Sequence, residues 1–324
     1  MTSQARDIFK TYSEQLRIVE QQLIEIFKSD VPLIPLIGQH ILKSGGKRIR
    51  PLFLLLSSDL CGYKGENRYL LAAIIEAIHT ASLLHDDVID GAETRRGSPS
   101  AHSIWGNQLV ILVGDYLYSH ALRLAVNQKN QEIMEALSEA TTKMTEGEIL
   151  QLHKTADPDM TTEEYFKIIS AKTGILISVA CKIGGILSNK SEGHKSALAR
   201  FGMKTGIVFQ LIDDILDYVA RQEDLGKKLG KDLEEGKITM PLIYLLKVAS
   251  DSEKEEIKRI ITEETTKAMG SITSLFSKYN VIEESLNIAK RLIEEAKSEL
   301  DIFPSSPEKE AMLYMADYAM LRDK

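Results

Sequence analysis

Apolar residues recur at every third or fourth position along most of the chain, which is the spacing of one buried face of an α-helix. In the first segment this stripe consists of Ile8, Tyr12, Leu16, Val19, Leu23 and Phe27. The eight prolines leave four long proline-free spans, and the alternating pattern of β-strands is almost absent. The pattern therefore predicts an all-α protein.

Helix start signals agree with this prediction. Thr161 followed three residues later by Glu164 is typical of a capping box, and Ser306 before Pro307 predicts the start of the last helix. No internal repeat, low-complexity tract or Gly/Ser linker divides the chain. We therefore expect one large helical bundle, a single domain spanning residues 1–324.

The composition narrows the class of protein. With 44% hydrophobic and 27% charged residues in 324, the chain is neither disordered nor collagen-like, and two cysteines exclude a disulfide scaffold. The net charge of −7 predicts no general attraction to nucleic acid, so any anion site must be local. Cys61 and Cys181 match no metal or redox spacing.

The apolar stretches are interrupted by charged or polar residues before they reach the ~18 residues of a membrane span. Asp115 and Lys182 are two of these interruptions, and the N-terminal residues lack the apolar core of a secretory signal. The sequence therefore predicts a cytoplasmic protein.

Two segments share the spacing D-D-x-x-D, at residues 86–90 and 213–217. In a helix the first and last aspartates of each motif are neighbours on one face, so each motif directs several carboxylates to one side. Both motifs lie in apolar sequence, where uncompensated negative charge is costly. Mg²⁺ prefers carboxylate, water and phosphate oxygens, so two such helices facing each other predict a Mg²⁺-diphosphate site. Two solvated acidic faces are the alternative.

Basic residues follow or precede these motifs at four places, in the segments 45–51, 95–97, 172–174 and 226–232. Each cluster alone is equally consistent with a solvated patch. Their joint position beside the carboxylates favours a polyanionic ligand, held by metal ions and directly by Arg and Lys.

These motifs together resemble the trans-isoprenyl diphosphate synthases, also called polyprenyl synthetases. The matching segments are GGKRIRP (45–51), HTASLLHDDVID (79–90), RRG (95–97), GDYL (114–117), GE (147–148), KTG (172–174), FQLIDDILD (209–217) and GKKLGKDLEEGK (226–237). The resemblance implies helices around a central cavity, usually in a homodimer. It also implies condensation of an allylic diphosphate with isopentenyl diphosphate.

The resemblance implies three groups of site residues. Two or three Mg²⁺ ions that bridge the allylic diphosphate are implied to bind Asp86, Asp90 and Asp213, supported by Asp87 and Asp217. The same diphosphate is implied to contact Arg95, Lys172, Thr173, Gln210, Lys227 and Lys237. The isopentenyl diphosphate is implied to contact Lys47, Arg50, His79 and Arg96. Without the resemblance, His79 is interpreted as a core histidine, and Tyr314, Tyr318 and Met320 as core residues.

Product length is predicted from the residues that precede Asp86. Ser82, Ala81 and Ile78 lie four, five and eight positions before it, on the side of the helix that we expect to lead into the bundle. Relatives that stop at farnesyl or geranylgeranyl diphosphate commonly carry bulky residues at the first two positions. The small residues here predict a long product, hexaprenyl to decaprenyl, typical of quinone side chains.

Three other functions remain open from the sequence. The chain could be a geranylgeranyl or farnesyl diphosphate synthase, or a catalytic subunit that requires a small partner. A terpene cyclase is disfavoured because resemblance to that class would require a second motif of Asn or Asp, then Ser or Thr, then Glu, whereas this chain has Asp213, Asp214 and Asp217. A non-catalytic subunit is disfavoured because all six aspartates are present. Because a long product is very apolar, we expect the protein to contact a membrane at most peripherally, when the product is released.

Overall fold

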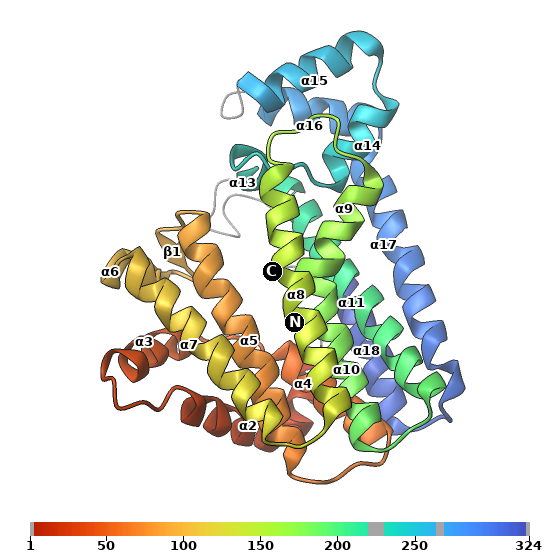
Figure 1. Ribbon diagram of the computed structural model, residues 1–324. Coiled ribbons are helices and arrows are strands. Elements are labelled where there is room, and N and C mark those ends of the chain that lie inside the picture. Colours follow the sequence, from red (N-terminus) through yellow and green to blue (C-terminus); the bar gives the residue numbers. More distant parts are fainter. Residues whose placement is uncertain (1–2, 220–229, 264–268, 322–324) are drawn as a thin grey trace.

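Helices provide nearly all regular structure in the computed structural model, which describes residues 3–219, 230–263 and 269–321 (Figure 1). The first helices are α1 (Ser3–Thr11), α2 (Ser13–Ile26), α3 (Leu33–Lys43), α4 (Ile49–Leu60), α5 (Asn67–Ile89), α6 (Ala101–Trp105), α7 (Asn107–Val126) and α8 (Gln131–His153). The next are α9 (Thr162–Ile169), the π-helix η1 (Ser170–Gly174), α10 (Ile175–Leu187) and α11 (Glu192–Val219). The C-terminal part contains α13 (Lys231–Glu234), α14 (Met240–Val248), α15 (Asp251–Glu263), α16 (Met269–Lys278), α17 (Val281–Ser298), the 3₁₀-helix η2 (Glu299–Ile302) and α18 (Pro307–Met320). The all-α prediction is confirmed.

Long helices form the bundle that carries the site. α10 packs against α11 and α4, and α5 packs against α7. The buried apolar side chains of the described residues form one cluster that extends from α1 to α18. Figure 1 shows α5 and α7 on one side of the molecule and α8, α10 and α11 on the other. The two aspartate motifs lie on α5 and α11, on these two sides.

The structure contains the helix starts predicted from the sequence, but the first predicted helix is interrupted. Thr161 and Glu164 form the capping box, and the Ser306 hydroxyl accepts a hydrogen bond from the Lys309 amide at the start of α18. The N-terminal stripe is divided between α1 and α2, because the chain leaves helical geometry at Tyr12. There the buried Tyr12 hydroxyl donates a hydrogen bond to Asp59, at 2.8 Å.

Among the described residues, β-structure is limited to a short hairpin, in which β1 (Thr94–Arg95) pairs with β2 (Ser98–Pro99). The turn residues Arg96 and Gly97 both have positive φ, 53° and 77°. Two consecutive left-handed residues match the twist of a tight hairpin, and glycine adopts that conformation without steric cost. The hairpin places two neighbouring arginines beside the C-terminal end of α5.

Two helical segments are long and apolar enough to cross a membrane by length and composition, Asn107–Val126 and Thr162–Leu187. Both belong to the bundle in this structure. The second is two-thirds buried by its neighbours. α7 is one-third buried, and its outer side exposes several large apolar residues.

Candidate active site

A cavity of about 1470 Å³ lies between the two aspartate helices. Most of the site residues predicted from the sequence line it: Lys47, Arg50, His79, Ser82, Asp86, Asp90, Arg95, Arg96, Lys172, Thr173, Gln210, Asp213, Asp217 and Lys237. Apolar side chains that include Tyr118, Met144, Ile177 and Phe209 complete the wall. The cavity therefore combines acidic, basic and apolar surfaces.

Three predicted site residues lie elsewhere, and a fourth is not described. Ala81 and Ile78 are fully buried in the core and do not line the cavity, unlike their neighbour Ser82. The reason is helical geometry, because five residues turn the chain by about 140°, so Ala81 and Asp86 point in different directions. Asp87 is also absent from the lining. Lys227 lies outside the described residues.

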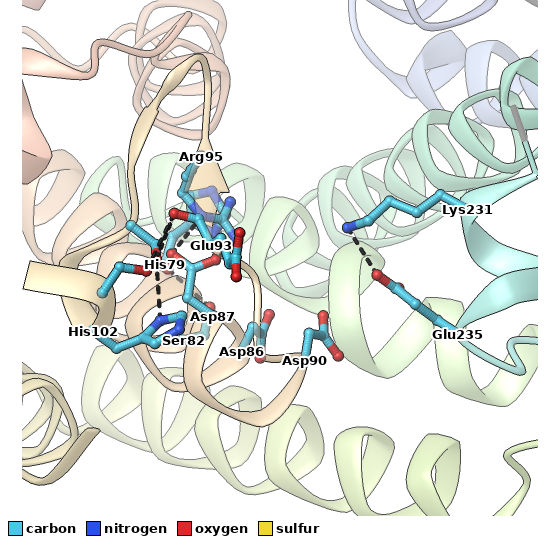
Figure 2. A network of polar contacts seen from close by, with 12 residues as sticks. His79, Ser82, Asp86, Asp87, Asp90, Glu93, Arg95, His102, Lys231 and Glu235 are labelled. Atoms are coloured by element: carbon cyan, nitrogen blue, oxygen red, sulfur yellow. Dashed lines mark hydrogen bonds and ion pairs between the residues drawn. The ribbon is translucent and has the colours of Figure 1, made fainter. Parts of the chain in front are cut away.

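The first motif separates its three carboxylates into two sets. Asp86 and Asp90 lie side by side and face the cavity, whereas Asp87 is directed towards Arg95 (Figure 2). The Arg95 guanidinium donates to both oxygens of Asp87, at 2.7 and 2.8 Å. Burial raises the pKa of Asp86 to about 6, and Lys172 offsets this only in part. The prediction that Asp87 supports metal binding does not match this geometry, because its carboxylate is already paired with an arginine.

The second motif is held by hydrogen bonds from two other elements and from its own helix. Asp213, Asp214 and Asp217 all line the cavity, and Asp217 accepts hydrogen bonds from the backbone amides of Lys231 and Asp232 at the start of α13. Asp214, between them, is 4% exposed and accepts hydrogen bonds from Tyr165 at 2.6 Å and from Gln210 at 2.8 Å. Burial raises the pKa of Asp214 even so. The two hydrogen bonds to Asp214 thereby hold α11 in the rotation that directs Asp213 and Asp217 towards the cavity.

Lysines connect the two sides of the cavity. The Lys237 ammonium lies 3.3 Å from Asp90 and 2.7 Å from Glu235. Lys172, on the π-helix η1, lies 2.9 Å from Glu148 and 3.9 Å from Asp86. Both lysines pair with carboxylates at the cavity wall, where they can also contact an anionic ligand.

A second group of cations lies on the other part of the cavity wall, around His79. Burial and the neighbouring guanidinium groups of Arg50, Arg95 and Arg96 hold the pKa of His79 well below its usual range, so the imidazole is neutral. Two carboxylates contact Arg48 beside this group: the buried Glu76 lies 3.2 Å from its guanidinium, and Glu20 lies 3.4 Å from it. Clustered guanidiniums with a neutral histidine are suited to bind a diphosphate.

Several side chains of the site were given no role from the sequence. Tyr165, Glu148, Gln151 and Asp232 line the same cavity, and so do Arg48 and Glu76. Tyr165 directly follows the capping box but belongs to no motif that indicates chemistry. Glu148 lies in the matching segment GE (147–148), and Gln151 is three residues further along α8, a spacing that a search for one polar face could have found. Burial raises the pKa of Asp232, whose carboxyl group is close to Asp214 and Asp217.

The donor set fits magnesium. Asp86, Asp90, Asp213 and Asp217 all present carboxylate oxygens, the ligands that hard divalent cations prefer. In the described part of the chain, no three metal-ligating side chains gather in one cluster. Mg²⁺ commonly binds through one or two carboxylates together with water and substrate phosphates, so one motif on each side suffices. A bound cation would also relieve the cost of burying the Asp86 charge.

The comparison with known proteins decides the family. A sequence profile of the polyprenyl synthetase family matches residues 31–279. The chain belongs to the polyprenyl synthetase family. Polyprenyl synthetases similar to it include the octaprenyl diphosphate synthase of Escherichia coli, which is 37% identical over 94% of this chain and 95% of that protein. Bacillus subtilis heptaprenyl diphosphate synthase component 2 is 34% identical over 94% of this chain and 87% of that protein.

Solved structures extend the similarity to the whole fold. A decaprenyl diphosphate synthase from Rhodobacter capsulatus superposes with a TM-score of 0.93 at 34% identity, covering 98% of this chain and 99% of that one. A Caulobacter crescentus polyprenyl synthase, complexed with calcium and isoprenyl diphosphate, gives 0.92 at 35% identity and covers 98% and 97%. A geranylgeranyl diphosphate synthase of Methanosarcina mazei is also similar, 34% identical over 88% of this chain and 89% of that protein.

Proposed function

We propose that this polyprenyl synthetase condenses isopentenyl diphosphate with an allylic diphosphate, head to tail, to make a long all-trans polyprenyl diphosphate. One observation carries the proposal. Two aspartate helices and two separate groups of cations share one cavity that also has apolar walls. Two groups of cations can hold two diphosphates, and apolar walls can hold a growing hydrocarbon chain.

The reaction breaks the C–O bond between the allylic carbon and its diphosphate, which leaves with the electron pair. The isopentenyl double bond attacks the allylic carbon, forms the new C–C bond and then loses a proton, for which the departing diphosphate is an available acceptor. Mg²⁺, when bound, neutralises charge on that leaving group. The residues of the site place the two substrates beside each other. Their fixed positive charges stabilise the departing diphosphate without having to reorganise as its negative charge develops.

Named residues have distinct parts in this proposal. Asp86, Asp90, Asp213 and Asp217 hold the metal ions. Lys172, Thr173, Gln210 and Lys237, with Arg95, bind the allylic diphosphate, and Lys47, Arg50, His79 and Arg96 bind that of isopentenyl diphosphate. Asp87 positions Arg95 rather than metal, and Asp214 positions the second motif through Tyr165 and Gln210.

The long product is supported by the small Ser82 side chain at the cavity wall and by the similarity to octaprenyl and decaprenyl diphosphate synthases. The similar geranylgeranyl diphosphate synthase makes a short product the second candidate. A quinone side chain is the use we propose for a long product.

A product assay tests the reaction and the chain length together. Purified protein is incubated with Mg²⁺, labelled isopentenyl diphosphate and farnesyl diphosphate, and the dephosphorylated products are sized by chromatography. We expect a ladder that ends beyond the geranylgeranyl product, and no product when EDTA removes Mg²⁺. A single short product contradicts the long-chain part of the proposal, and no incorporation with any allylic primer contradicts the reaction itself.

We also propose that the protein works as a homodimer through α7 and α8. The outer sides of these helices expose large apolar residues, with Leu112 63% and Ile149 62% exposed. α7 and α8 also both contribute to the cavity lining, through residues such as Tyr118 and Thr145. Symmetric pairing of this surface with a second copy buries the apolar residues of both chains and supports the two helices from outside the cavity.

Leu112→Glu is expected to shift the sedimentation mass from twice the 36.2 kDa chain towards a single chain, because it places a charge in the paired apolar surface. Ile302→Glu is a matched control, since Ile302 is also half exposed but lies on η2, away from α7. A monomeric wild type contradicts the homodimer. Activity gained only with a second, different protein would instead favour the two-component arrangement that the name of the Bacillus relative suggests.

The proposed location is the cytoplasm. Both cysteines are free and buried, which fits a reducing compartment. Contact with a membrane is proposed only as peripheral, at the step where a long apolar product leaves the cavity. No binding to nucleic acid is proposed, since the chain carries net negative charge.

A further inference from the structure

Tyr318 in the C-terminal helix α18 does more than fill the core, as its sequence pattern suggested. Its side chain is 1% exposed. Its hydroxyl accepts a hydrogen bond from the Lys47 ammonium at 3.0 Å, and the same ammonium lies 5.6 Å from the centre of the Tyr318 ring. The two residues are 271 positions apart in the sequence. Tyr318 thus connects the end of the chain to a cation of the cavity wall.

The two partners lie on different elements. Lys47 lies on the short connection between α3 and α4, where Gly45 and Arg48 have positive φ values of 71° and 50°. α18 packs against α4, α11, α17 and α1, and Tyr318 is buried. A lysine side chain otherwise loses much rotamer freedom when it binds a ligand, so holding it in advance reduces the entropy cost of binding.

The chemistry of the partner matters as much as its position. Arg95 pairs with the Asp87 carboxylate and Arg48 with that of Glu76, whereas Tyr318 offers Lys47 a phenol hydroxyl. A carboxylate cancels positive charge, whereas a phenol hydroxyl accepts a hydrogen bond and leaves the charge in place. The ring face adds cation–π attraction without cancelling the charge. Tyr318 can therefore orient Lys47 and preserve its attraction for a diphosphate.

We propose that Tyr318 is a positioning residue for the non-allylic substrate, acting through Lys47. It holds the Lys47 ammonium at the cavity wall, where that ammonium binds the diphosphate of isopentenyl diphosphate. This inference rests on the proposed function. It makes the C-terminal helix part of the binding site of one substrate, in addition to part of the bundle.

Tyr318→Phe removes the hydroxyl and keeps the ring. A hydrogen bond to a charged group corresponds to roughly tenfold in affinity, so we expect the KM for isopentenyl diphosphate to rise about tenfold. The KM for the allylic diphosphate and kcat are expected to stay within about twofold, because Lys47 contacts only one substrate and no transition-state charge is lost. Steady-state kinetics with each substrate varied in turn measures this difference.

Tyr12→Phe is the matched control. It also removes a buried hydroxyl bonded to a charged group, the Asp59 carboxylate at 2.8 Å, but Asp59, unlike Lys47, does not line the cavity. We expect it to lower the melting temperature and to leave both KM values unchanged. A purely structural role of Tyr318 predicts that the two variants behave alike, and this result would overturn the proposal.

A double-mutant cycle gives a second test that does not depend on the size of the first effect. Isopentenyl diphosphate binding is measured by calorimetry for the wild type, Tyr318→Phe, Lys47→Ala and the double variant. Adding Tyr318→Phe to Lys47→Ala is expected to change Kd by less than about twofold, since the ammonium that Tyr318 positions is gone. The same loss in both backgrounds would contradict the proposal. A wild type that transfers no prenyl group would instead refute the proposed function, whatever the variants show.

Discussion

Asp86→Ala is expected to lower turnover by at least about a thousandfold without unfolding the protein. The substitution removes a carboxylate that faces the cavity beside Asp90, and with it the stabilisation of the leaving diphosphate by metal. Asp213→Ala on the opposite helix is expected to have an effect of the same order. Single-turnover rates at saturating Mg²⁺ measure the loss in the chemical step.

Two comparisons make this prediction specific. Asp159→Ala removes an exposed carboxylate that pairs with Lys258 outside the cavity, and it is expected to leave turnover unchanged. Circular dichroism and thermal unfolding show whether each variant is folded. Turnover within about tenfold of the wild type in a folded Asp86→Ala protein would remove Asp86 from the proposed metal site.

Ser82→Phe is expected to change the main product from a long chain to a geranylgeranyl or farnesyl chain, while condensation continues. Ser82 lies on the same face of α5 as Asp86, one turn deeper, and it lines the cavity. A phenyl ring there blocks the path of the growing hydrocarbon but does not contact either diphosphate group. Chromatography of the dephosphorylated products measures the change.

Ala81→Phe provides a comparison at the neighbouring position. Ala81 is fully buried and outside the cavity lining, so a phenyl ring there is expected to strain the core and lower the melting temperature. It shortens the product only if the hydrocarbon passes that side of α5. An unchanged product distribution in Ser82→Phe contradicts the proposed path of the chain.

The fold was predictable because its signals are local and periodic. The apolar stripes, the capping box at Thr161 and the serine cap of α18 are set by neighbours a few residues apart, and the structure contains each of them. The break at Tyr12 was not predictable, since it accompanies a hydrogen bond to Asp59, 47 residues away. The spacing of apolar residues along the chain does not indicate such long-range contacts.

The site was predictable in its residue types but less so in their partners. The repeated D-D-x-x-D motifs located both cavity-facing carboxylate pairs. The motif alone could not show that Asp87 points to Arg95, or that Asp214 is buried against Tyr165, because both facts depend on how α5 and α11 are rotated in the bundle. The same rotation places Ala81 away from the cavity and Ser82 in it.

The π-helix η1 links catalysis to the tolerance of the chain for insertions and deletions. Its five residues, Ser170–Gly174, contain Lys172 and Thr173, and they lie between α9 and the buried α10. A π-turn arises when one residue is inserted in an α-helix, and its wider turn takes up the extra residue, so the helix after it keeps its orientation. Deleting one residue here would therefore leave Leu176 and Ile183 in the core but would change which side chains of η1 face the cavity, Lys172 and Thr173 among them. Homologous chains that use this site are therefore expected to keep the length of this segment fixed, even where its individual side chains vary.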